Sequence, residues 1–395
     1  MRKVMAALSF FVLFLLPAAG ADRDFRPLER KTEQLRALRF TRQVPILMVD
    51  GAGMRKVLAD QLRKEYPEAE WPIMEKSLKA FSLIPPKMNL RAVMSGLLDE
   101  QVVGLYDPEE KKLFVSDTPL AGSELLSGLA GADFQMGDVY ILHEMVHALT
   151  DQCFDLNSLP LKDKENEDRA SAARCVVEGD ATWVMMRYMY DAMKVPQESR
   201  SQLDDVMSGM NLGRELMGTS IPAYLQENLL VAYLAGQALV KSAYERGGFD
   251  GVNRLYKNPP QSMEQVLHME KYFSGNDRPV GIVLLPPQIF AAEGWRELGS
   301  GVWGEFNTRI ILQEWGVPEE VARKASEGWG GDAYRVFEGP KGELAFAWAT
   351  VWDSDRDAAE FVGACAQAKG VFAVREGKRV MLTKGAPAAA ERKAA

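Results

Sequence analysis

The chain has 395 residues, of which 47% are hydrophobic and 26% are charged, and its formal net charge is -8 at pH 7. This composition is typical of a globular protein with apolar material for two or three cores, which excludes a fibrous or disordered chain. The excess of acidic residues disfavours nucleic acid or an anionic lipid surface as a partner, because such a surface repels phosphates.

The first 21 residues have the layout of a secretory signal peptide. Arg2 and Lys3 precede an apolar run over residues 4–16, and small residues follow up to Ala21. The run is shorter than the roughly 20 residues that span a bilayer, so a retained membrane anchor is the alternative. We therefore expect cleavage after Ala21 and a protein that is exported to the periplasm or secreted, without stable insertion in a membrane.

Residues 22–98 form an N-terminal region with mostly helical patterns. A charged helical segment comes first, and residues 43–67 indicate a short strand, a glycine turn and an amphipathic helix. Residues 101–117 alternate around a polar turn at 107–111, which predicts a β-hairpin. This hairpin is either purely structural or an edge strand on which a substrate docks.

The middle of the chain is predicted to be helical, and a capping box at Ser262 and Gln265 indicates one more helix start. The helical patterns cover 137–154, 166–193, 222–246 and 250–257.

The remainder of the chain, residues 285–384, is predicted to be a small α/β module. Two helical stretches come first, followed by a strand at 343–353, a helix at 354–370 and a closing hairpin. Residues 385–395 are rich in alanine and charge, and we expect a disordered tail.

Two of the three histidines in the chain lie four residues apart in "YILHEMVHALTDQ". On a helix, His143 and His147 point to the same side, so that they can bind one metal ion. H-E-x-x-H is the zinc peptidase pattern, in which the glutamate, here Glu144, takes a proton from the water on the metal. The alternative is a chance match on a core helix.

A catalytic zinc ion needs a third protein ligand, and Glu178 is the candidate. It lies in the middle of the next long helix, in "VVEGDATWVMM", where a carboxylate among apolar residues is hard to explain as an exposed charge. A satisfied surface charge is the alternative. We expect one Zn²⁺ per chain, held by His143, His147 and Glu178.

"HEMVHALTDQ" and "VVEGDA" together resemble the gluzincins, zinc metallopeptidases whose third ligand is a glutamate on a second helix. The resemblance covers residues 140–183. It implies a zincin-like catalytic domain that hydrolyses peptide bonds, with Glu144 as general base and a histidine or tyrosine that stabilises the oxyanion. His268, the only other histidine, is the candidate donor, with Tyr272 and Tyr224 as alternatives and a structural histidine as the other interpretation.

The sequence departs from the thermolysin-like pattern next to the third ligand. Those enzymes carry an aspartate four residues after the ligand glutamate, where it orients a zinc-bound histidine, and this chain has Thr182 there. Asp180 lies two residues after Glu178 and points about 200° round the helix. The group that orients the histidines is therefore not evident from the sequence.

These observations predict an α+β, mainly helical protein with a zincin-like catalytic domain over 99–284, between the N-terminal region and the C-terminal module. The expected function is that of an exported zinc metallopeptidase acting on peptides or proteins. The alternative is a non-hydrolytic protein that keeps zinc in a binding or scaffold role.

Three cysteines in an exported chain leave at least one unpaired. Cys153 and Cys175 flank the predicted metal site, and a disulfide between them is feasible if the two ligand helices run antiparallel. Cys365 is expected to be free.

Overall fold

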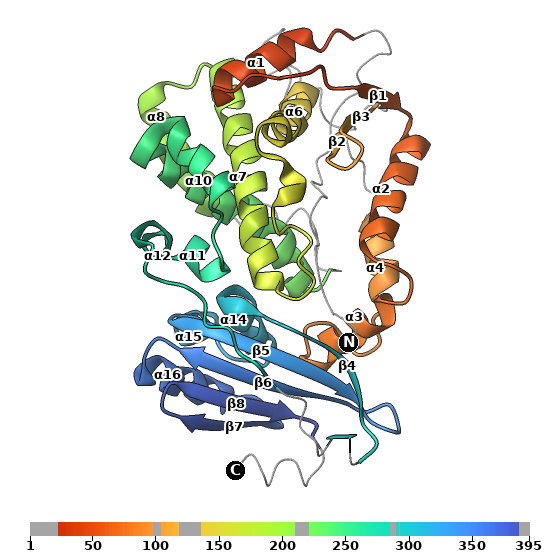
Figure 1. Cartoon of the computed structure of the whole chain (residues 1–395), viewed down its shortest axis with the longest axis vertical. Helices are drawn as coiled ribbons and strands as arrows, with labels where there is room; N and C mark the ends of the chain where they lie inside the picture. Colours follow the sequence, from red (N-terminus) through yellow and green to blue (C-terminus); the bar gives the residue numbers. More distant parts are fainter. Residues whose placement is uncertain are drawn as a thin grey trace.

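The computed structural model describes residues 23–97, 104–117, 136–209, 221–284, 290–291 and 293–386. A helical part with a small sheet lies above a five-stranded sheet and its helices in Figure 1, which makes the fold a mixed α/β one. The predicted signal peptide and nearly all of the predicted tail lie outside the described residues.

The segment up to residue 117 supplies three strands and several helices, most of which run along one side of the molecule in Figure 1. Its elements are α1 (Arg26–Arg36), β1 (Ile46–Val49), α2 (Gly51–Glu65), α3 (Trp71–Ala80), α4 (Leu90–Leu97), β2 (Gly104–Asp107) and β3 (Lys112–Ser116).

The three strands form one sheet in the order β1-β3-β2. β1 pairs with β3 in parallel, and β2 pairs with β3 antiparallel, with Tyr106 opposite Leu113. The predicted hairpin is thus confirmed. β2 lies at the edge of this sheet and contacts the next helix in the chain.

Long helices fill the middle of the molecule, and short ones link them to the C-terminal part. They are α6 (Met136–Phe154), η1 (Leu156–Ser158), α7 (Glu167–Ala192), α8 (Gln197–Gly209), α10 (Ala223–Lys257), α11 (Met263–Leu267) and α12 (Met269–Ser274).

The predicted helix boundaries in this region are close to the observed ones. Asn166 caps α7 by accepting a hydrogen bond from the backbone N–H of Arg169 at 2.9 Å, and Ser262 caps α11 through the N–H of Gln265. The two predicted helices at 222–246 and 250–257 form one element, α10, which is interrupted by non-helical backbone at Gly247 and Gly248.

α7 and α10 approach each other closely at a pair of glycines. A Cβ atom added to Gly179 would lie within 3.0 Å of the Gly236 backbone, and one added to Gly236 would meet the Cys175 carbonyl equally closely. Only residues without a side chain permit this crossing. It brings α10 directly against the turn of α7 that carries Glu178.

The C-terminal module is an antiparallel sheet in the order β4-β5-β6-β8-β7, with helices packed on it. Its elements are β4 (Arg296–Gly301), α14 (Gly304–Glu314), α15 (Glu319–Ser326), β5 (Trp329–Glu338), β6 (Leu344–Trp352), α16 (Asp355–Cys365), β7 (Val371–Glu376) and β8 (Arg379–Lys384). The predicted helices, the strand and the closing hairpin are found here, while β4 and β5 were not predicted.

The N-terminal region reaches into the core of this module. Phe81, at the end of α3, is fully buried and stacks on Phe346 with ring centroids 4.0 Å apart. The indole nitrogen of Trp315 donates a hydrogen bond to the Phe81 carbonyl at 2.8 Å. One continuous set of buried side chains therefore extends from the helical part into the C-terminal sheet.

The three cysteines have separate surroundings, and none of them forms a disulfide. Cys153 is exposed beside the Arg39 carbonyl, whereas Cys175 is buried against Met263 and Val231. The bridge considered from the sequence is therefore not formed, because α7 turns Cys175 toward α10 and α11, away from the surface position of Cys153.

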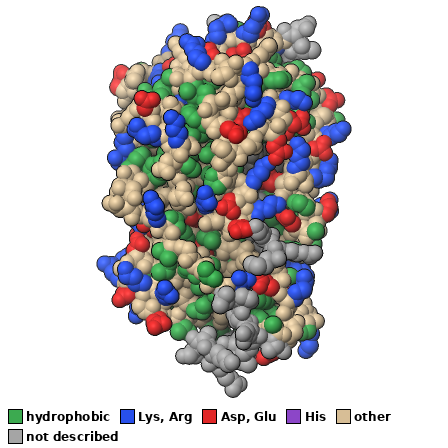
Figure 2. All heavy atoms as spheres, viewed as in Figure 1, with side chains coloured by type: hydrophobic (Ala, Val, Ile, Leu, Met, Phe, Trp, Pro, Cys, Tyr) green, Lys and Arg blue, Asp and Glu red, His purple; other side chains and the backbone are tan. Residues whose placement is uncertain are grey.

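Figure 2 shows basic and acidic side chains interspersed over the visible face. Within the described residues, no helix combines the length and the apolar character required to cross a bilayer.

Candidate metal centre

Both histidines of the H-E-x-x-H pattern lie on one side of α6, deep in the protein. His143 and His147 are 2% and 1% exposed, and their ring centroids are 4.7 Å apart. One side of α6 packs into the core through residues such as Leu142 and Val146, which are fully buried. The packing of this helix therefore holds both imidazoles in place.

α7 brings the third predicted ligand to the same point. An oxygen of Glu178, Oε2, lies 3.2 Å from Nε2 of His143 and 3.5 Å from Nε2 of His147. Zinc bonds of about 2.0–2.1 Å in tetrahedral directions separate neighbouring donor atoms by about 3.3–3.4 Å. Two imidazole nitrogens and one carboxylate oxygen are also the ligand types that zinc prefers, so these residues fit one zinc ion.

Glu144 lies beside this set of ligand atoms and contacts the edge strand. Ligand-type atoms of His143, Glu144 and His147 lie within 4.8 Å of one another. Oε2 of Glu144 accepts a hydrogen bond of 2.8 Å from the backbone N–H of Tyr106 on β2. The carboxylate is thus fixed between the candidate metal position and β2.

Two further contacts attach the hairpin to α6. The hydroxyl of Tyr106 donates to Asp151 at 2.6 Å, and Lys111 in the turn donates to the other oxygen of the same carboxylate at 2.8 Å. Asp151 is one helical turn after His147 on α6. The two contacts therefore fix the position of β2 along α6 relative to the two histidines.

Without a metal ion, the protonation of the site depends on burial and on the interaction of Glu178 with the two imidazoles. Burial alone would raise the pKa of Glu178, but the imidazoles of His147 and His143 outweigh it and hold that pKa far below its usual range. Burial lowers the pKa of His147, but Glu178, followed by Glu144 and Asp180, raises it to about 9. The metal-free site thus holds a proton between His147 and Glu178 near neutral pH.

Glu144 has a different environment from Glu178. Burial raises the pKa of Glu144 above its ordinary value, and the two imidazoles and the N–H of Tyr106 offset this only in part. A carboxylate with a raised pKa binds a proton more readily, which suits a group that accepts and then releases one.

Tyr233 on α10 is a residue of this site that the sequence did not reveal. Its ring centroid lies 6.1 Å from that of His143, and the two planes are inclined by 34°. Burial, Glu178 and Glu144 raise the pKa of Tyr233 well above its ordinary value, so the phenol keeps its proton. It is a neutral donor next to the candidate ligands, carried there by the glycine crossing of α7 and α10.

The three donors considered from the sequence lie elsewhere in the fold. His268, between α11 and α12, pairs with Glu305 of α14 at 2.8 Å, and this pairing raises its pKa. Tyr272 donates to the Asn258 carbonyl at 2.6 Å, and Tyr224 is buried against Trp303 of the C-terminal module. The interactions of His268 with neighbouring charges involve Glu305, Glu264 and Lys271, and none of the candidate ligands.

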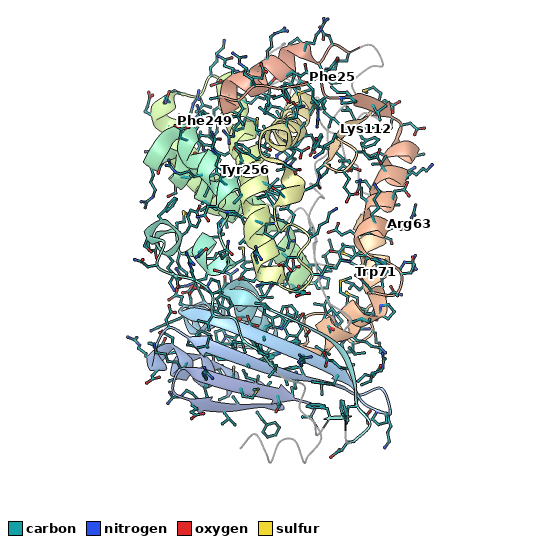
Figure 3. The ribbon with its side chains drawn as sticks, viewed as in Figure 1. Phe25, Arg63, Trp71, Lys112, Phe249 and Tyr256 are labelled. Carbon is teal, nitrogen blue, oxygen red and sulfur yellow. The ribbon has the colours of Figure 1, made fainter. Side chains whose placement is uncertain are left out.

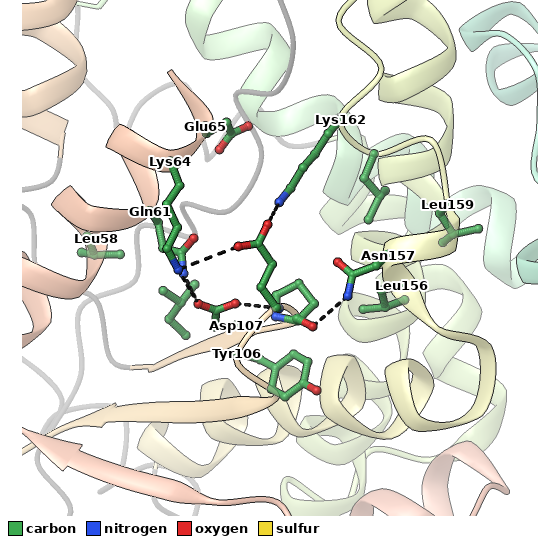
Figure 4. A pocket seen from close by; sticks show the side chains of 14 residues that line it. Leu58, Gln61, Lys64, Glu65, Tyr106, Asp107, Leu156, Asn157, Leu159 and Lys162 are labelled. Atoms are coloured by element: carbon green, nitrogen blue, oxygen red, sulfur yellow. Dashed lines mark hydrogen bonds and ion pairs between the residues drawn. The ribbon is translucent and has the colours of Figure 1, made fainter. Parts of the chain in front are cut away.

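A cavity of about 100 Å³ lies between α2 and the β2–β3 hairpin (Figure 4). Its apolar wall is formed by leucines, and two ion pairs lie at its rim, since Lys64 lies 3.5 Å from Asp107 and Lys162 contacts Glu109. Glu65 also lines the cavity, and burial raises its pKa well above the ordinary value, which favours the neutral acid. The leucines are Leu58, Leu105, Leu156, Leu159 and Leu161. The cavity suits an uncharged, aliphatic group.

Comparison with known proteins covers a different part of the chain. Residues 291–391 match a family model described as a domain of unknown function, DUF8575. This match spans the C-terminal module and includes none of the residues of the candidate metal centre. The searches of curated proteins and of solved structures returned no match.

Proposed function

We propose that this protein is a zinc-dependent metallopeptidase of the gluzincin type, with one zinc ion bound by His143, His147 and Glu178. The observation that carries the proposal is the meeting of two Nε2 atoms and one carboxylate oxygen at distances of 3.2 and 3.5 Å, with Glu144 next to them. A structural zinc site does not need this fourth group.

The residues of the site have separate tasks in such a reaction. Zinc held there supplies a Lewis acid that activates water and polarises a peptide carbonyl. Glu144 accepts the proton of the attacking water and delivers it to the leaving amine, so that water is added across the C–N bond. The phenol of Tyr233 donates a hydrogen bond to the carbonyl oxygen as negative charge develops on it.

Among the described residues, no further strand pairs with β2 on the side where Tyr106 faces Glu144. An extended peptide can add to the edge of a sheet as a further strand, and we propose that the substrate binds along β2 in this way. The leucine-lined cavity lies beside the same strand, since Leu105 and Tyr106 of β2 are among the residues that line it. We propose that this cavity receives an aliphatic side chain of the substrate.

We also propose that the protein acts outside the cytoplasm. The proposal rests on the layout of residues 1–21, with its basic start, apolar run and small residues before Asp22. Amino-terminal sequencing of the mature protein checks it, and a mature chain that retains Arg2 would contradict it.

One observation favours the alternative of a non-hydrolytic zinc protein. Thr182, four residues after Glu178, has a buried hydroxyl without a hydrogen bond to any described residue, and it supplies no carboxylate to orient a histidine. An imperfectly oriented site binds zinc but catalyses poorly.

Replacement of Glu144 by glutamine separates the two functions. For a peptidase, Glu144→Gln should retain zinc and thermal stability and lose hydrolysis of a broad peptide library by at least about 100-fold, the usual contribution of a general base. Glu293→Gln, a change of the same kind at an exposed position of the C-terminal module, is the control and should leave the rate unchanged. Wild-type protein that holds zinc and cleaves no peptide would support the binding role instead.

A further inference from the structure

Glu65 is placed in the wall of the leucine-lined cavity by the helix that ends with it. Leu58, Gln61 and Glu65 follow one another at helical spacing on α2, and all three line the cavity. Arg63 lies on another side of this helix and points to solvent (Figure 3). The same face of α2 therefore supplies part of the apolar wall and the carboxyl group of Glu65.

The carboxyl of Glu65 has no hydrogen bond or ion pair to any described residue. In Figure 4, dashed lines connect Lys64 with Asp107 and Lys162 with Glu109, whereas none reaches Glu65. The side chain is partly buried, and a polar group in such a place costs free energy as long as it lacks a partner. A ligand that pairs with this carboxyl recovers that free energy.

The basic side chains that act on the Glu65 carboxyl already have carboxylate partners. The pairs are Lys162 with Glu109, Lys164 with Glu70, and Arg174 with Glu167. Glu65 is also the last residue of α2, where the negative end of the helix dipole disfavours a carboxylate. Both conditions favour the neutral acid, in agreement with the raised pKa of Glu65.

A neutral carboxyl group can both donate and accept a hydrogen bond. A carboxamide does the same, so the two groups can form a pair of hydrogen bonds without burying a charge. A charged group is less suitable, because Lys64 and Lys162 would repel an ammonium, and Asp107 and Glu109 would repel a carboxylate. The polar end of the cavity thus suits an uncharged amide.

The rest of the cavity suits the methylene groups that carry such an amide. Its wall is made of leucines, and its volume of about 100 Å³ accommodates several water-sized groups, each of which needs about 10–15 Å³. Among the side chains of a peptide, glutamine combines methylene groups with a carboxamide. Leucine and methionine fill the same wall but leave the Glu65 carboxyl unpaired.

We propose that Glu65 is a specificity-determining residue and that the cavity binds a glutamine side chain of the peptide substrate, with the carboxamide paired to the Glu65 carboxyl. This inference rests on the proposed function and narrows its substrate class. The leucines contact the aliphatic part of the side chain, and Glu65 recognises its end. Tyr106 places the cavity beside the site of reaction, because it lines the cavity while its backbone N–H binds Glu144.

Peptide cleavage by the zinc-loaded wild type and by Glu65→Leu tests the inference. A library varied at each position should show a preference for glutamine at one position near the cleaved bond. For two peptides that differ only by glutamine or leucine there, we expect a wild-type kcat/KM ratio of about 10 or more in favour of glutamine, since two hydrogen bonds are involved. Glu65→Leu should reverse this preference, because leucine offers the amide no partner.

Glu68→Leu is the matched control. Glu68 follows α2 closely in the sequence, but it lies outside this cavity, where its exposed side chain pairs with Arg91 at 2.6 Å. The loss of an exposed ion pair has little effect on the folded protein. The control variant should therefore keep the wild-type ratio for the two peptides.

The melting temperature gives a readout that needs neither zinc nor activity. Glu65→Leu removes a carboxyl without a partner and adds an apolar group next to leucines, so the metal-free variant should melt at a higher temperature than the wild type. A variant that fails to fold, or that melts at a lower temperature, overturns the inference, since the carboxyl would then be bound within the protein.

The cleavage results separate this inference from the proposed function. If the zinc-loaded wild type cleaves peptides but prefers glutamine at no position, or if Glu65→Leu keeps a preference for glutamine, the role of Glu65 is wrong and the metallopeptidase proposal stands. If wild-type protein that holds zinc cleaves no peptide, both proposals are overturned.

Discussion

Tyr233 is the single residue on which the proposed reaction depends most directly after Glu144. The candidate ligands and the base carry negative charge or accept hydrogen bonds, whereas the phenol is a neutral donor next to His143 and Glu178. A donor of this kind stabilises charge that exists mainly in the transition state. Its contribution should therefore appear in the rate and not in the affinity for metal or substrate.

Replacement of this tyrosine by phenylalanine keeps the ring and removes the donor. For Tyr233→Phe we expect unchanged zinc content, a nearly unchanged KM and a kcat about 100-fold lower. The control is Tyr244→Phe on the same helix, because Tyr244 packs on Trp183 with ring centroids 4.6 Å apart. Steady-state kinetics on one good peptide measures both variants, and a normal kcat for Tyr233→Phe would reduce this residue to a packing role.

The candidate ligands can be found in the sequence because their positions depend on local geometry. Spacing on one helix brings His143 and His147 together, and Glu178 stood out as a charge in an apolar run. Tyr233 lies close to them only because α7 and α10, which are distant in the sequence, cross. No pattern in the sequence around Tyr233 indicates this crossing. His268 is a candidate from the sequence because it is the one other histidine of the chain, and the number of histidines carries no information about distance.

At the scale of elements, the contact of α7 with α10 decides whether the site forms. Gly179 follows Glu178 directly, and its lack of a side chain lets α10 approach and bring Tyr233 to the ligands. A methyl group at this position would push the two backbones apart. The glycine therefore links the packing of the helices to the geometry of the metal centre.

Gly179→Ala should lower the free energy of unfolding by about 1–3 kcal/mol or more, because neither backbone can move without loss of contact. It should also weaken zinc binding, since Glu178 moves with its helix. Gly363→Ala on α16 is the matched control, because a Cβ there meets nothing within 4 Å. That change should increase stability by about 0.5–1 kcal/mol. Chemical denaturation measures both, and equal stabilities for the two variants would contradict the proposed crossing constraint.

Hydrophobic periodicity and capping residues in the sequence predict most of the helices, but they do not predict some of the strands. The glycine pair at 247–248 was predicted to separate two helices, and the backbone leaves the helical conformation there. β5 begins with "WGGDA", whose two glycines are poor strand residues, and β4 is short and polar. These strands are stabilised by pairing with their neighbours across the sheet, which the local sequence does not show.

At the scale of the whole molecule, the helices that carry the candidate metal centre share one set of buried side chains with the C-terminal module. Phe81 comes from the N-terminal region and lies among aromatic rings of the module, 5.0 Å from Trp303 and 5.3 Å from Tyr334 between ring centroids. His268 and Glu305 form a second contact between the helical part and the module. Parts that share a core are expected to unfold together.

Because the core is shared, we expect zinc bound in the helical part to stabilise the C-terminal module as well. Six of the eight tryptophans lie between residues 295 and 352, so tryptophan fluorescence mainly follows the C-terminal module. Zinc binds only the folded state of its site and raises the melting temperature of every part that unfolds with it. In the wild type, we therefore expect the transition seen by fluorescence to move to higher temperature as zinc is added.

Phe81→Ala should weaken this coupling. Truncation of a buried phenylalanine costs about 3–5 kcal/mol, and here some of the lost contacts join the two parts. We expect the variant to melt earlier by fluorescence, with a transition that responds less to zinc than in the wild type. Phe372→Ala is the control, since Phe372 on the edge strand β7 is 48% exposed, and it should retain the full response to zinc. If the wild type binds zinc but its melting temperature by fluorescence does not change, the module unfolds independently of the candidate metal centre.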